Sequence, residues 1–316
     1  MAPMRSWPLR LVVVTLAFTC AASDADHRRI SCDPETESVK LSDTNCPNND
    51  AWLSAFSRHG QRKKTIVVIG CNKGVDAVRL FAQYDTREKP YLLKTWQNAL
   101  GEALPGNTGA CGQVTSAEEL SKPLWTTPLP EVYCVEPMPA NVRLLTSLAT
   151  STHIPEHFHV LQYAVGLSHG SVLFPDAAAG TENLGVDIGG GNKAHVNAST
   201  VDSLFGHLDN IEMLLIDTEG NDALVILGAA RVLQRVRYLE FENHSVGEWA
   251  TFKLKTIIDF LDNLHFDCWW TTNTGILVRI THCWHNKYAG IKSWSNIACA
   301  KRNDAWWYDM DAIARG

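Results

Sequence analysis

One segment in the second half of the chain constrains its fold more than any other. Residues 213–216 are an apolar run of strand character. Two carboxylates, Asp217 and Glu219, follow directly, and Gly220 then turns the chain into an amphipathic stretch. In an open α/β sheet, ligands bind just beyond the carboxyl ends of the strands. Acidic residues also favour the first turn of a helix, which accounts for Asp222 but not for Asp217, because Asp217 continues the strand. The segment therefore predicts a ligand site at the edge of a sheet.

Strand-like and helix-like segments alternate along the chain. Apolar runs of strand length occupy residues 65–69, 132–135, 158–165 and 236–241, and further strands are expected at 170–174, 266–270, 274–280 and 296–300. Helical spacing occupies residues 74–84, 139–148, 222–234 and 247–264, whereas the glycine- and alanine-rich residues 177–193 are typical of a loop. Such alternation favours a parallel sheet with right-handed crossovers. The sequence thus predicts an α/β fold with a doubly wound, mostly parallel, Rossmann-like sheet.

The first 22 residues have the pattern of a secretory signal. Arg5 and Arg10 precede an apolar run that ends at Phe18, and Cys20 and Ala22 are small residues at the −3 and −1 positions of a cleavage site. The run is shorter than the ~20 residues of a comfortable membrane-spanning helix. We therefore expect a lumenal or secreted protein with no stable membrane span after cleavage. An uncleaved signal-anchor is the alternative.

The rest of the chain divides into two expected parts. Residues 23–60 are polar and predict a leader segment that packs onto the domain, and residues 61–316 predict the domain itself, with an insertion at about 85–130. The formal net charge is −6, and basic residues do not cluster beyond a triplet at 62–64. Nucleic acid is therefore not expected as a partner, because its binding needs clustered basic residues.

Cysteines and sequons fit an oxidising compartment. Eight of the nine cysteines follow the signal segment, and secretory compartments permit disulfides. Cys71 and Cys134 lie in or beside apolar strands and are expected to be packed thiols. The candidates for pairing are Cys32, Cys46, Cys111, Cys268, Cys283 and Cys299, and the sequence does not choose among their connectivities. Asn197 and Asn243 begin glycosylation sequons. No metal site is expected, because no Cys-x-x-Cys spacing occurs.

Glycines and a carboxylate follow the first two strands. Gly70 and Gly74 bracket the first turn, with Cys71 and Asn72 between them, and they allow the backbone to approach a ligand closely. The turn lacks the full Gly-x-Gly-x-x-Gly dinucleotide fingerprint. Glu136 follows the second long strand, where doubly wound folds hold ribose hydroxyls. A helix cap before Pro137 is the alternative interpretation of Glu136.

A histidine follows the strand at 236–241. Alternation places Glu240 and Glu242 on one face of this strand, and His244 comes just after it. A histidine beside carboxylates is a candidate general base near neutral pH, and an ordinary surface histidine is the alternative. Six of the eleven tryptophans lie at or after Trp269. Core packing is their commoner use, and stacking on a sugar is the functional alternative.

Taken together, these motifs resemble the FkbM-type methyltransferases. The resemblance rests on Gly70-Cys-Asn-Lys-Gly74, Glu136-Pro137-x-Pro139, Ile216-Asp217-Thr-Glu219-Gly220 and Leu227-Gly228-Ala229, in the order typical of that family, over about residues 65–245. It implies a class I methyltransferase that uses S-adenosyl-L-methionine and usually acts on a hydroxyl. The cofactor-binding residues it implies are Gly70, Cys71, Asn72, Gly74, Glu136, Pro137 and Asp217. Glu219 would face the acceptor, and we take Glu219 and His244 as the candidate catalytic residues.

Two positions depart from the family pattern. The family usually has an acidic residue where this chain has Val68, and it tends to have a lysine where this chain has Leu215. These departures motivate an alternative, a non-catalytic cofactor- or partner-binding pseudoenzyme of the same fold. A dinucleotide-dependent oxidoreductase shares the sheet but gives the Ile-Asp-x-Glu-Gly segment no role. The expected acceptor is a hydroxyl-bearing small molecule or glycan in the secretory pathway.

Overall fold

The computed structural model describes residues 32, 44–60, 62–186 and 191–315. The expected signal at residues 1–22 and the first part of the expected leader therefore lie outside the described residues. Contacts within the chain divide it into residues 1–32 and 33–316, and the description below concerns the second unit. Within the described residues, no helix is long and apolar enough to cross a membrane.

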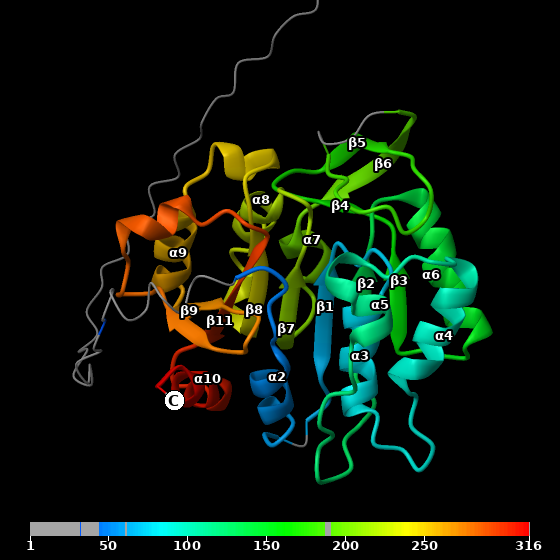
Figure 1. Ribbon diagram of the computed structural model, residues 1–316, viewed down its shortest axis with the longest axis horizontal. Coiled ribbons are helices and arrows are strands. Elements are labelled where there is room, and N and C mark those ends of the chain that lie inside the picture. The colour runs from blue at the N-terminus through cyan, green and yellow to red at the C-terminus, as the bar shows by residue number, and fades with distance from the viewer. Residues whose placement is uncertain (1–31, 33–43, 61, 187–190, 316) are drawn as a thin grey trace, which may run out of the picture. The chain divides into compact units, whose positions relative to one another are not determined.

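Eight strands form the main sheet. They are β1 (Thr65–Ile69), β2 (Glu131–Val135), β3 (Phe158–Leu161), β7 (Ile211–Ile216), β8 (Val236–Asn243), β9 (Phe266–Thr271), β10 (Leu277–Arg279) and β11 (Ser295–Lys301). Their order is β10-β9-β11-β8-β7-β1-β2-β3 (Figure 1). The strands from β8 to β3 pair in parallel, whereas β11 is antiparallel to both of its neighbours. The mostly parallel sheet agrees with the predicted fold class, and its order reverses between β1 and β7, where such folds bind ligands.

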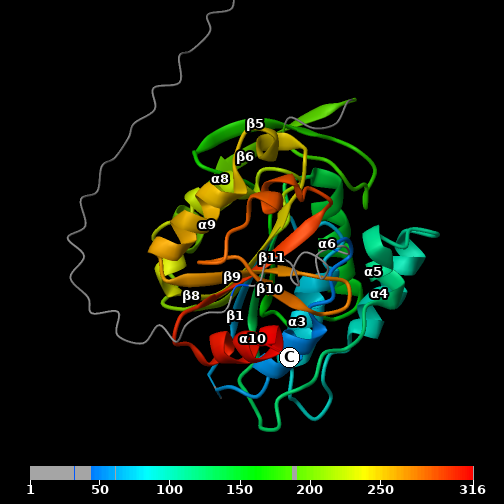
Figure 2. The same cartoon turned by 60° about the vertical axis from the view of Figure 1, so that its left-hand side comes forward.

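Helices cover both faces of this sheet. One apolar cluster contains side chains of α2 (Asp50–Phe56), α3 (Val75–Tyr84), α4 (Leu93–Ala103), α6 (Pro139–Ser151) and α10 (Ala305–Arg315). The other contains side chains of α7 (Val201–Phe205), α8 (Asp222–Leu227) and α9 (Leu254–Asn263). Figure 2 shows α8 and α9 on the opposite side of the strands from α3 and α4. The second face carries shorter helices than predicted, because 3₁₀ turns at Val232–Arg235 and Gly247–Ala250 replace parts of the expected helices.

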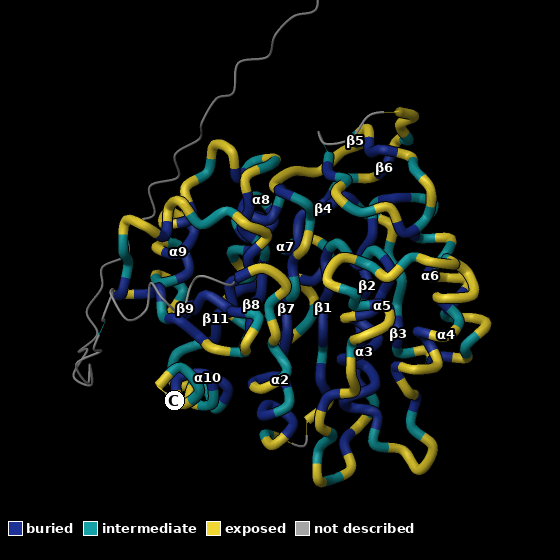
Figure 3. Tube along the Cα trace, in the orientation of Figure 1, coloured by how far each residue is buried: buried dark blue, intermediate teal, exposed yellow. Residues whose placement is uncertain are grey.

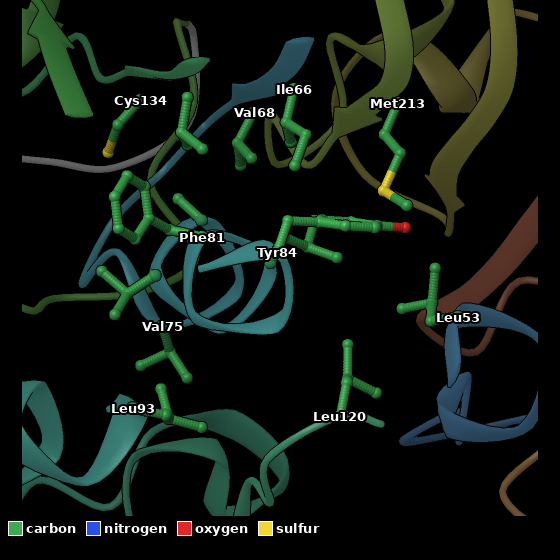
Figure 4. Close-up of a cluster of buried hydrophobic side chains, with 14 of the residues drawn as sticks. Leu53, Ile66, Val68, Val75, Phe81, Tyr84, Leu93, Leu120, Cys134 and Met213 are labelled. Carbon is green, nitrogen blue, oxygen red and sulfur yellow. The ribbon is translucent and has the colours of Figure 1, made fainter. Parts of the chain in front are cut away.

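The central strand β1 is buried on both faces. Ile66 and Val68 belong to the first cluster, and Val67 and Ile69 belong to the second. This is the expected consequence of alternation in a strand covered on both sides, and Figure 3 shows the buried residues running along the central strands. In the first cluster, Ile66 and Val68 face the helix that carries Phe81 (Figure 4).

The two departures from the family pattern are neighbours in this sheet. Val68 of β1 is paired in register with Leu215 of β7. Both side chains pack in or against the first apolar cluster. The acidic residue and the lysine that the resemblance leads one to expect are therefore replaced together, by two apolar residues that contact the same core. No unpaired charge is left at either position.

A second, three-stranded sheet lies near the carboxyl edge of the first. It consists of β4 (Ala164–Val165), β6 (Lys193–Ser199) and β5 (Gly170–Pro175), in that order. The sequence predicted one strand over 158–165, but β3 ends at Leu161 and β4 joins this second sheet. No strand was predicted at 193–199, because its apolar signal is weak: Val196 is buried while His195 and Asn197 are exposed.

Disulfides connect distant parts of the domain. Cys46 is bonded to Cys111 and Cys268 to Cys299, and both bonds fall within the predicted set. The prediction that Cys71 and Cys134 are packed thiols is wrong, because they form a disulfide with a Cα–Cα distance of 5.4 Å. The two cysteines meet because β1 and β2 are neighbours in the sheet. The turn after β1 folds back so that the Cys71 amide donates to the Val135 carbonyl of β2.

Removing the Cys71–Cys134 disulfide should destabilise the domain more than removing Cys46–Cys111. The two bridges close segments of similar length, with sequence separations of 63 and 65, so a chain-entropy argument gives each about 2–4 kcal/mol. Cys71 and Cys134 are also buried, whereas Cys46 and Cys111 are exposed. Their replacement by alanine therefore adds a packing loss. Urea unfolding of the two double alanine variants tests this, and equal losses would contradict it.

Candidate active site

A pocket opens at the carboxyl edge of the main sheet, beyond β1, β2 and β7. Of the residues predicted for a site, Gly70, Asn72, Glu136, Pro137, Asp217 and Glu219 line it. Cys71, Gly74 and His244 are not among its lining residues. The small sheet supplies the opposite wall, with Val165 and Phe174. The pocket thus has acidic groups on the side of the main sheet and apolar groups across from them.

The two glycines of the first turn make room for protein, not for a ligand. Gly70 has a φ of +85°, and a Cβ atom there would lie 1.6 Å from the carbonyl oxygen of Asp217. At Gly74 a Cβ atom would lie 2.8 Å from the Leu145 side chain. Gly70 therefore lets β7 end against the first turn, and Gly74 lets α6 pack behind it. From the insertion, the Trp96 indole donates to the Lys73 carbonyl at 2.9 Å and supports the same turn.

Glu136 is held in one orientation by three donors. Its Oε2 accepts from the Asn72 amide at 2.8 Å, and its Oε1 accepts from the Met138 amide at 2.9 Å and from Asn141 Nδ2 at 3.4 Å. Burial raises the pKa of Glu136, and these hydrogen bonds act in the opposite direction. A carboxylate oxygen can accept more than one hydrogen bond. Three of its roughly four acceptor positions are thus occupied, and about one is left at the pocket wall.

Four carboxylates converge beyond β7 and β8. Burial holds the pKa of Asp217 well above its usual range, and the negative charge of Glu219 is the second largest cause. Burial, and secondly the negative charge of Asp217, raise the pKa of Glu242 to about 10. Burial raises the pKa of Asp222 to about 7. The Asp217 side chain is reached by water although protein surrounds it. It therefore lies in a pocket that is open to water, where solvent screens part of the repulsion between the acidic groups.

Two glycines bring the loops that carry these groups together. A Cβ atom on Gly220, after β7, would lie 2.9 Å from the Cα atom of Gly247, after β8. The Glu248 amide donates to the Gly220 carbonyl across the same contact, at 2.9 Å. Just before Gly220, Glu219 adopts a φ of +53°. A left-handed conformation is costly for a residue with a side chain, so this loop holds Glu219 against its backbone preference.

Asp222 and a loop near the small sheet fix the carboxylates further. Asp222 is buried and accepts from the Gly220 amide at 3.2 Å. The Asn183 amide donates to Glu219 Oε1 at 2.9 Å, and Glu182 pairs with Lys73. The sequence did not indicate Glu182 or Asn183, because they lie in the predicted loop at 177–193, far from any motif.

His244 is fully buried, so the interpretation of it as a surface histidine is wrong. The Val246 amide donates to its Nδ1 at 3.2 Å, and its ring stacks on Trp294 with centroids 4.4 Å apart. Burial lowers the pKa of His244 to about 4, so the ring is neutral at pH 7. Since Nδ1 accepts, the single ring proton is on Nε2. In this arrangement Nε2 is a donor.

The tryptophans and sequons separate into distinct environments. Trp269, Trp270 and Trp306 are buried in the core, which is the packing role, whereas Trp294 is 40% exposed beside His244. Asn243 is buried and its side chain donates to the Ile291 carbonyl at 2.8 Å. Asn197 is exposed. Of these two sequons, only the one at Asn197 is therefore accessible for glycan attachment in the folded domain.

The sheet order, with an acidic pocket at its reversal, is that of a doubly wound α/β fold. Residues 113–268 match the family model described as "Methyltransferase FkbM domain". The resemblance to the FkbM methyltransferases is therefore confirmed over these residues. The match includes Glu136, Asp217, Glu219 and His244 and begins after the turn at Gly70–Gly74. Neither the search of curated proteins nor that of solved structures found a match.

Proposed function

We propose that this domain is an S-adenosyl-L-methionine-dependent methyltransferase that methylates a hydroxyl group. The family match supports methyl transfer in general, and methyltransferases of this kind generally use that cofactor. The observation that supports the proposal most is the common pocket, in which Glu136 at the end of β2 and Asp217 at the end of β7 line opposite ends of one acidic wall.

The residues present fit such a cofactor. Glu136 would accept a hydrogen bond from a ribose hydroxyl, and Val165 and Phe174 offer apolar surface for the base. Asp217 would lie at the end of the pocket that meets the cationic sulfonium, where a carboxylate is favourable by charge. When bound, the cofactor supplies an activated methyl group.

The acceptor would be held on the side of Glu219. Its Oε1 is fixed by Asn183, while its Oε2 is buried without a hydrogen-bond partner among the described residues. A free carboxylate oxygen in that position can accept a hydrogen bond from a hydroxyl and orient it. Orientation of two reacting groups in a pocket that excludes water contributes a large part of catalysis in bimolecular transfers. Glu219 is thus the proposed orienting residue, and His244 is no longer favoured as the base because its Nε2 carries the proton.

The proposed compartment is the secretory pathway. Buried and exposed disulfides connect the domain, and such bonds persist in oxidising compartments. Lumenal glycans carry hydroxyls in quantity, so a glycan or a hydroxyl-bearing small molecule is the proposed acceptor class.

Transfer of a labelled methyl group from the cofactor into hydroxyl-bearing acceptors of a secretory extract tests the proposal. We expect transfer by the oxidised full-length protein, and a loss of about 10²-fold in turnover in Glu219→Gln, because positioning effects are of that size. Glu156→Gln, an exposed change, is the control. If the protein binds the cofactor without transferring its methyl group, the pseudoenzyme interpretation, motivated by Val68 and Leu215, is favoured instead. If it binds no cofactor at millimolar concentration, the proposal is wrong.

A further inference from the structure

A second polar cluster lies beyond the pocket lining, between the ends of β7 and β8. Each of Glu219, Glu242 and His244 offers one atom, and these three atoms all lie within 4.8 Å of one another. Glu242 Oε2 is 3.6 Å from His244 Nε2, which is too long for a hydrogen bond. The contact between Gly220 and Gly247 holds the two loops in this position.

Two atoms of this cluster are buried without a hydrogen-bond partner among the described residues. They are His244 Nε2 and Glu219 Oε2, and the side chain of His244 is 0% exposed. A buried polar atom without a partner costs about 1–3 kcal/mol. Two unsatisfied polar atoms on residues of one cluster therefore indicate a site for a bound group.

The charge of the cluster indicates a cation. Asp217 and Asp222 raise the electrostatic repulsion at Glu242. Lys73, whose charge acts on Glu219, is already paired with Glu182. Carboxyl groups thus outnumber the cationic groups here, and a bound cation would stabilise their charged forms over the protonated ones.

We propose that the carboxylates of Glu219 and Glu242 bind a hard divalent cation of calcium's size, with the Nε2–H of His244 donating to an oxygen in the cation's coordination shell. Oxygen ligands lie about 2.3–2.6 Å from Ca²⁺, so two of them are at most about 5 Å apart across the ion. The spacing of the cluster fits this limit without rearrangement.

The orientation of His244 argues against a zinc site. A histidine that binds zinc uses a nitrogen without a proton and donates its other N–H to an acceptor. Here the Val246 amide donates to Nδ1, which leaves the proton on Nε2, the nitrogen that faces the carboxylates. His244 is therefore a donor to a cation-bound oxygen, such as a water or an acceptor hydroxyl. This site does not depend on methyl transfer for its existence.

Terbium(III) luminescence in the oxidised protein tests the site, because Tb³⁺ resembles Ca²⁺ in size and its emission is sensitised by a nearby tryptophan. Trp294 stacks on His244, so we expect sensitised emission that Ca²⁺ displaces with a Kd of about 10⁻⁴–10⁻³ M, typical of weak extracellular sites. Trp294→Phe should reduce the emission but retain Ca²⁺ affinity measured by calorimetry.

Substitutions identify the ligands. Glu242→Gln should weaken Ca²⁺ binding by about tenfold or more, and nearby Glu248→Gln should leave it unchanged, since metal affinity depends on the groups that hold the ion. His244→Gln should weaken it less than Glu242→Gln. Thermal unfolding with and without Ca²⁺ gives a second measurement, because an ion that binds only the folded state raises the melting temperature. Equal Ca²⁺ affinity in wild type and Glu242→Gln would overturn the site, and a loss in His244→Gln as large as in Glu242→Gln would overturn the oxygen-only ligand set.

Discussion

Gly70→Ala should lower the free energy of unfolding by about 3–5 kcal/mol, because two separate costs combine. The residue has a φ of +85°, which is strained for alanine. Its new Cβ atom would also lie 1.6 Å from the Asp217 carbonyl oxygen. The obstacle is backbone, so no side-chain rotation relieves it, and β1 and β7 must move apart at the site. Urea unfolding followed by tryptophan fluorescence measures the loss.

The matched control is Gly101→Ala in α4. A Cβ atom at Gly101 would have nothing within 4 Å, and no positive φ occurs there. Alanine in the interior of an exposed helix is expected to gain about 0.5–1 kcal/mol over glycine. The same substitution is thus expected to change the free energy of unfolding in opposite directions at the two positions. If Gly70→Ala were as stable as the wild type, the close approach of β7 to the first turn would be wrong.

The central sheet could be predicted because its signals are local. A strand buried on both faces must be apolar throughout, and β1 and the end of β7 have that pattern. The placement of Asp217 follows from the same logic, since a residue directly after a buried parallel strand lies at the carboxyl edge of the sheet.

The remaining parts of the site depend on contacts between residues distant in the sequence. Nothing near Glu219 indicates that the Asn183 amide fixes its side chain, because that bond crosses 36 residues. Alternation placed Glu242 on a face of its strand, yet its meeting with Glu219 depends on the contact of Gly220 with Gly247. The burial of His244 likewise follows from Trp294, which comes from a later loop.

The Cys71–Cys134 disulfide shows a related limit of sequence reasoning. A cysteine within an apolar strand is typical of a packed thiol, and Cys134 is indeed fully buried. Its bond to Cys71 depends on the pairing of β2 with β1, which places Cys134 opposite Val68 in register. Burial and bonding are therefore not alternatives here. The bridge links the turn after β1 to the strand that carries Glu136.

Glu136→Gln is expected to reduce the affinity for S-adenosylhomocysteine by about 10–10²-fold, since a hydrogen bond to a charged group contributes about 1.5–3 kcal/mol. Under the proposed function, a ribose hydroxyl donates to the remaining acceptor position of this carboxylate. The amide of glutamine also places a donor against the donating amide of Asn72 or Met138. A loss of affinity alone would therefore not separate ribose recognition from a disturbed turn.

A double-mutant cycle with the ligand separates the two effects. The wild type should bind the 2′-deoxyribose analogue of S-adenosylhomocysteine at least about tenfold more weakly than the parent, because one charge-assisted hydrogen bond is lost. In Glu136→Gln, that preference should largely disappear, whereas in Glu156→Gln it should stay. Calorimetry measures all six affinities. If Glu136→Gln bound both ligands more weakly by the same factor, Glu136 would act only on the turn, and its assignment to the ribose would be wrong. A preference abolished by the loss of this one carboxylate requires contact with the hydroxyl, because a disturbed turn weakens both ligands alike.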